Sequence, residues 1–132
     1  MEKEKQKELI FKLSMFEQQI MQLQQQIESV GKGIDELNSL SFGLDDIDKS
    51  AGKEILSQLG KGVFVRSNLT SNELIVDIGH GNFVKKGIPE TKGIIREQTE
   101  KLMDVRKELE SSIEKVNKEA SKALEEFRKS QQ

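Results

Sequence analysis

Residues 9–44 read LIFKLSMFEQQIMQLQQQIESVGKGIDELNSLSFGL, and the spacing of their apolar side chains decides the fold. One row repeats every seven residues and consists of Leu9, Phe16, Leu23, Val30, Leu37 and Leu44. A second row with the same spacing, offset by three and four, consists of Leu13, Ile20, Ile27 and Ile34. Two interleaved rows of this length are typical of a coiled coil. We therefore expect a long helix over residues 3–44, with Gln6 and Ser41 as polar ends of the second row.

The last third of the chain repeats this pattern more weakly. One row consists of Ile95, Leu102, Leu109, Val116 and Ala123, and a second of Ile113, Ala120 and Phe127, preceded by the polar Thr99 and Arg106. Pro89, the single proline, suits the first turn of a helix because its missing N–H needs no partner there. These features predict a second helix over residues 89–130.

Two helices of nearly equal length predict a hairpin in which they form one antiparallel coiled coil. Folding back in this way places Leu23 near Ser111 and brings both chain ends to one tip. A homodimer of parallel helices, with the middle segment as a separate domain, is the alternative arrangement at this stage.

The middle segment, residues 45–88, predicts β-structure after a polar linker over 45–52. Alternating apolar residues indicate about four short strands, near 55–59, 63–69, 74–78 and 83–86, with turns at Thr70–Glu73 and Gly79–Asn82. Isolated hairpins are marginal in water, so we expect this segment to pair with other subunits. The residues expected to carry that assembly are Val63, Val65, Leu69, Leu74, Val76, Ile78 and Phe83.

Composition excludes several function classes. The 21 Lys and Arg balance 23 Asp and Glu, which argues against a nucleic-acid binder. There is no cysteine and only one histidine, His80, which we expect in an exposed turn. We therefore expect no catalytic residue, no metal and no cofactor. The charged N-terminal segment and the lack of a long apolar run predict no signal peptide, no membrane contact and a cytoplasmic location.

Near the two chain ends, the helices carry more apolar side chains than the seam, the contact between the two helices, needs. Ile10, Phe11 and Met15 lie off the heptad rows of the first helix, and Leu124 lies off those of the second. Exposed apolar side chains on a charged coiled coil are typical of a contact site. The alternative is that they widen the seam or pack on a neighbouring subunit. The residues expected to form or border this contact surface, which would suit varied apolar partners, are Ile10, Phe11, Leu13, Met15, Phe16, Leu124 and Phe127.

Several stretches resemble the prefoldin family, and more narrowly its archaeal alpha-type subunits. The resemblance covers nearly the whole chain and includes the Gln-rich first arm over residues 18–27. In the centre, residues 55–65 resemble the family's Leu-rich strand, glycine turn and Val/Ile strand, and residues 75–81 its apolar strand ending in Gly-x-Gly. The sequence departs where the family has Leu-Val-Pro-Leu and this chain has Ile-Leu-Ser-Gln, at 55–58. Two hairpins, not one, distinguish alpha-type from beta-type subunits.

The resemblance implies a mainly α fold with a small β element: a long antiparallel two-helix coiled coil joined by two β-hairpins. It implies that two alpha-type and four beta-type subunits join through their hairpins into a β-barrel body. It further implies an ATP-independent chaperone that captures unfolded client proteins at the coiled-coil tips and passes them to a group II chaperonin. A coiled-coil adaptor that binds one specific folded partner is the alternative function, and no acid/base pair or cofactor motif supports an enzyme.

Overall fold

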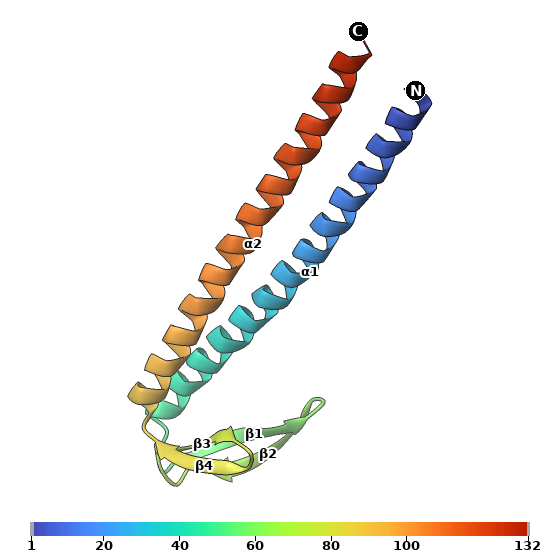
Figure 1. The fold of residues 1–132 in the computed structure, drawn as a ribbon. Coiled ribbons are helices and arrows are strands. Elements are labelled where there is room, and N and C mark those ends of the chain that lie inside the picture. The colour runs from blue at the N-terminus through green and yellow to red at the C-terminus, as the bar shows by residue number, and fades with distance from the viewer. Residues whose placement is uncertain (1, 132) are drawn as a thin grey trace. The chain divides into compact units, whose positions relative to one another are not determined.

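The computed structural model describes residues 2–131 and contains two long helices and four short strands (Figure 1). The element order is α1 (Glu2–Asp48), β1 (Glu54–Gly60), β2 (Val63–Asn68), β3 (Leu74–Gly79), β4 (Asn82–Lys86) and α2 (Ile88–Ser130). The predicted fold class, two coiled-coil helices joined by two β-hairpins, is confirmed.

The chain divides into two compact units, and each is described by itself. We call residues 1–34 and 101–132 the terminal unit, and residues 35–100 the central unit. In the terminal unit α1 and α2 lie side by side and run in opposite directions (Figure 1). Glu2 near the start of α1 and Gln131 just after α2 line one small groove. The helices therefore pair within one chain, and the alternative of parallel helices in a homodimer is wrong.

The heptad rows of the sequence form the seam between the helices of the terminal unit. Along α1, Leu9, Leu13, Phe16 and the later members of both rows up to Val30 are half-buried, and Ile34 is buried. Along α2 the half-buried positions include the polar Arg106, whose long aliphatic stem can cover apolar neighbours. The register is close to the predicted one. The pairing of Leu23 with Ser111 would place Gly33 beside Lys101, and in the structure Gly33 faces Leu102, one residue further along.

The central unit contains two separate antiparallel hairpins, β1–β2 and β3–β4. Positive φ angles at Gly60, Lys61 and Gly62 form the first turn, and at Gly79, His80 and Gly81 the second. Glycine suits these positions because L side chains are strained there. His80 is exposed in its turn. The second turn matches the one expected at Gly79–Asn82, and Thr70–Glu73, where the other turn was expected, lies in the connection between β2 and β3.

Helix α1 continues to Asp48, four residues beyond the expected end, so the expected polar linker over 45–52 is partly helical. The reason lies in a small core of Leu44, Ile88 and Ile95, against which Ile47 packs. Ile47 extends the apolar stripe by one more turn, and the stripe outweighs the polar residues around it. Lys92 of α2 forms an ion pair with Asp45 and so joins α2 to the last turn of α1.

Candidate functional site

A shallow groove lies between the two helices near the chain ends. It has a volume of about 420 Å³ and is lined by Phe11, Lys12, Met15, Phe16, Gln19, Glu119, Lys122, Ala123 and Glu126, which we call the tip groove. Phe11 is 67% exposed and Met15 is 46% exposed. Neither side chain belongs to the heptad rows that form the contact between the helices. The tip groove lies entirely within the terminal unit.

The tip groove combines an apolar floor with a charged rim. Phe16 and Ala123 are half-buried seam residues and provide the floor, while Phe11 and Met15 stand beside them. Two lysines and two glutamates surround the floor, so the rim carries no net charge. Such a surface can bind apolar side chains by burying them, and an unbranched Met adapts to different shapes. Its shallow form suits a flexible chain better than a rigid small molecule.

The structure brings together only part of the predicted binding surface. Phe11, Met15 and Phe16 line the tip groove, and Phe127 lines two smaller grooves that it shares with Lys5 and Ser130. Leu13 is a half-buried seam residue. Its placement agrees with the heptad pattern.

Ile10 and Leu124 lie outside the tip groove. They are 65% and 40% exposed. Both follow a position of the seven-residue rows directly, Leu9 in α1 and Ala123 in α2, so the heptad places them together on one flank of the seam. Phe11 and Met15 line the groove on the other side. The predicted surface is thus divided between two flanks of the coiled coil.

Ala123 is a residue whose contribution to the groove the sequence did not reveal. The heptad pattern placed it in the seam, where it is half-buried, but it also lines the floor of the tip groove. A small side chain at a seam position leaves space beside the larger Phe16, and that space forms the hollow. An alanine in a seam row is the signal that could have indicated a groove.

A second exposed apolar surface lies on the hairpins of the central unit. In β1–β2, Leu56 pairs with Arg66 and Gln58 with Phe64, so these side chains share one face. Leu56 is 68% exposed and Phe64 is 54% exposed. The opposite face carries Ile55, Ser57 and Ser67, which are half-buried.

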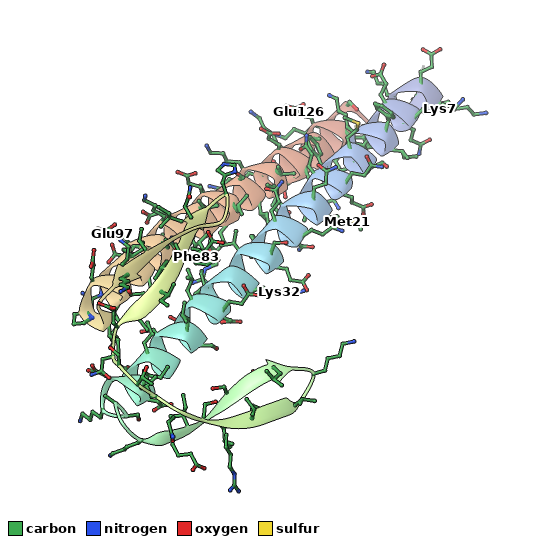
Figure 2. The ribbon with its side chains drawn as sticks, turned by 90° about the horizontal axis from the view of Figure 1, so that it is seen from below. Lys7, Met21, Lys32, Phe83, Glu97 and Glu126 are labelled. Carbon is green, nitrogen blue, oxygen red and sulfur yellow. The ribbon has the colours of Figure 1, made fainter. Side chains whose placement is uncertain are left out.

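The hairpin β3–β4 has the same division into two faces. Leu74, Val76, Val84 and Lys86 share the half-buried face. Ile75 and Phe83 lie on the other face and are 72% and 63% exposed. Phe83 is labelled in Figure 2. Among the predicted assembly residues, Val63, Val65 and Ile78 are also exposed, whereas Leu69, Leu74 and Val76 are half-buried. Each strand pairs with one other strand in the described chain, which leaves one edge of each hairpin strand open.

Other kinds of site are not indicated in residues 2–131. The described residues hold no group of three or more His, Cys, Asp or Glu side chains that could bind a metal ion. They include no helix that is long and apolar enough to cross a membrane. The two features that call for a function are therefore the tip groove and the open hairpins.

Comparisons with known proteins agree with this geometry. The family model described as "Prefoldin subunit" matches residues 16–132. Prefoldin subunit alpha from Methanobrevibacter smithii is 33% identical over 110 residues, which cover 83% of this chain and 70% of that protein. Prefoldin subunit alpha from Pyrobaculum calidifontis is 30% identical over 98 residues, which cover 74% and 72% of the two chains.

A solved structure has the same fold. The cryo-EM structure of filamentous PFD from Methanocaldococcus jannaschii superposes with a TM-score of 0.77 and 20% identity, over 87% of this chain and 97% of that chain. A two-helix coiled coil joined by two β-hairpins defines the class of fold that the two chains share. The chain belongs to the prefoldin family and is similar to its archaeal alpha subunits, so it is a chaperone subunit.

Proposed function

We propose that this chain acts, without ATP, as the alpha-type subunit of a holding chaperone that captures non-native proteins in the tip groove. The observation that carries the proposal is the exposure of Phe11 and Met15 beside a floor of Phe16 and Ala123. A folded protein hides most of its large apolar side chains, whereas an unfolded one presents them. A shallow, adaptable apolar groove therefore favours non-native chains over folded ones.

Assembly would make weak grooves effective. One open groove of this size holds an apolar segment weakly, but several tips around one client raise the effective concentration of each site for the next segment. The proposed complex contains two alpha-type and four beta-type subunits, joined through the open hairpin edges and the exposed Leu56, Phe64, Ile75 and Phe83. Strand pairing between subunits would satisfy the backbone groups of those edges.

Release would follow the same physics. Because capture rests on several weak apolar contacts, a client can leave one tip at a time, and a group II chaperonin is the proposed receiver. The proposed place of action is the cytoplasm.

The test is an aggregation assay with the complex of this chain and a beta-type subunit. A chemically denatured protein is diluted into buffer with the complex, and light scattering is followed. We expect the complex to suppress scattering for unrelated clients, and Phe11→Ser combined with Met15→Ser to abolish most of that protection while the oligomeric mass stays unchanged. Full protection by the double variant would contradict the proposal. Binding to a single folded protein, with indifference to unfolded ones, would favour an adaptor instead.

A further inference from the structure

The first helix carries ten consecutive residues without a charge in a chain that is one-third charged. This stretch, residues 18–27, reads QQIMQLQQQI and lies between Glu17 and Glu28. Six of its residues are glutamines. Solvated coiled-coil helices normally carry charged residues at their outer positions. The lack of charge therefore needs a reason other than solubility.

A second groove opens beside this stretch. It has a volume of about 530 Å³ and is lined by Gln22, Gln25, Gln26, Ser29, Val30, Val105 and Leu109, which we call the arm groove. All of these residues belong to the terminal unit. Val30 and Leu109 are half-buried seam residues. Val105 lies off the seam and is 41% exposed, although it is apolar. The floor is thus apolar and the rim consists of amides and a hydroxyl.

The arm groove differs from the tip groove in its rim. Four charged side chains line the tip groove, whereas no charged side chain lines the arm groove. An ionised group entering the arm groove would lose water without gaining a counter-charge, so charged ligands are disfavoured. A glutamine amide both donates and accepts hydrogen bonds. These are the two functions that an extended polypeptide backbone offers at each residue.

The two grooves follow one another along the same face of α1. Met15, Gln19, Gln22, Gln26 and Ser29 are separated by three or four residues, so they form one ridge. Met15 and Gln19 line the tip groove, and the last three line the arm groove. From Gln19 to Ser29 the helix rises about 15 Å, the length of four to five extended residues. A chain segment held at the tip can therefore continue into the arm groove.

We infer that the arm groove is a second binding site, for an extended, uncharged segment of an unfolded polypeptide. The glutamines bind its backbone amides, and the floor of Val30, Val105 and Leu109 takes one or two of its apolar side chains. This inference rests on the proposed function and names the client chemistry: extended neutral segments, selected by backbone hydrogen bonding and by exclusion of charge. Backbone recognition tolerates many sequences, as a chaperone for varied clients requires.

The test measures binding of a defined peptide to the full chain in the oligomer that it forms in solution. The probe is a fluorescein-labelled soluble peptide of Thr, Val and Gln, and a sister peptide carries Glu in place of Gln. The Phe11→Ser/Met15→Ser background silences the tip groove, so fluorescence anisotropy reports the arm groove. We expect the neutral peptide to bind more tightly than the Glu peptide.

Matched variants locate the binding. Gln22→Glu with Gln26→Glu places two charges in the arm groove, and Gln18→Glu with Gln24→Glu places the same two charges on α1 outside both grooves. We expect the first pair to weaken neutral-peptide binding about tenfold or more, because charges without partners must be desolvated, and the second pair to change it less than about twofold. Lysines at 22 and 26, but not at 18 and 24, should reverse the preference toward the Glu peptide.

Equal effects of both pairs, or none, would overturn the inference. A change of oligomeric mass in the Gln22→Glu/Gln26→Glu variant would also overturn it, because the groove would then be covered by another subunit. The proposed function fails separately: if tip substitutions leave protection against aggregation intact while the peptide still binds the arm groove, only the tip assignment is contradicted. Lost peptide binding with intact tip-dependent protection contradicts only this inference.

Discussion

Gly33 of α1 lies so close to Leu102 of α2 that a Cβ atom at position 33 would approach the Leu102 Cδ1 atom to 3.3 Å. A Cβ atom at Gly31, two residues earlier in α1, would meet nothing within 4 Å. Both glycines lie inside a helix, where glycine is normally unfavourable. The close contact gives a physical reason for one of them and none for the other.

Replacing each glycine by alanine should separate these roles. Gly31→Ala should stabilise the assembled protein by about 0.5–1 kcal/mol, because alanine loses less backbone entropy in a helix. Gly33→Ala should gain clearly less, because its methyl group crowds Leu102. Urea denaturation followed by circular dichroism at 222 nm measures both. An equal gain for the two variants would show that the contact at Gly33 is unimportant.

The small core of the central unit should be sensitive to truncation. Leu44 is 5% exposed and packs with Ile88 and Ile95, so Leu44→Ala should cost about 2–4 kcal/mol of unfolding free energy. Phe42, two residues earlier on the same helix, is 73% exposed. Phe42→Ala should stay within about 0.5 kcal/mol of the parent protein in the same denaturation experiment. A comparable loss at both positions would contradict the described packing.

Two methionines on α1 provide a matched test of the tip groove. Met15 lines the groove, whereas Met21, labelled in Figure 2, lines neither groove although it is 60% exposed. Met15→Ser should weaken suppression of client aggregation several-fold, because it removes an adaptable apolar contact. Met21→Ser should leave it unchanged. The half-maximal concentration of complex in the scattering assay gives the comparison, and equal losses would argue against a localised site.

Two residues of β4 test the assembly surface. Phe83 and Lys85 lie two residues apart in β4 and therefore share one exposed face of β3–β4. Their cross-strand partners in β3 are Asp77 and Ile75. Phe83→Ser should shift the protein toward free subunits, because it removes a large apolar contact at the joining surface. Lys85→Ser should assemble normally, since an exposed ion pair such as Lys85 with Glu73 contributes little. Light scattering after size separation reports the mass, and a normal complex with Phe83→Ser would exclude this face from assembly.

The heptad rows allowed most of the coiled coil to be predicted from sequence. Ser41 and Thr99 of the central unit are half-buried despite their polarity, because a continuous helix fixes every seventh position once the apolar members are placed. The end of α1 could not be predicted the same way. Four polar residues surround Ile47, and only its packing against the core of Leu44 and Ile88 shows that the helix continues.

The grooves could be predicted from the sequence less well than the helices. Off-seam apolar residues near the chain ends indicated a surface, but not that Phe11 and Met15 would line one flank and leave Ile10 outside the groove. That division depends on the rotation of each helix about the seam and on the small Ala123 beside Phe16. The arm groove needs Val105 of α2 next to Gln26 of α1, a pairing set by the register of the two helices.

The most direct test of the account is site-specific photo-crosslinking from α1 in the assembled complex. A photoreactive side chain replaces Met15 in one sample and Met21 in another, and each complex is illuminated with an unfolded client. The account predicts a strong crosslink to the client from position 15 and a weak one from position 21. Client crosslinks of equal strength from both positions, or none from position 15, would contradict capture in the tip groove.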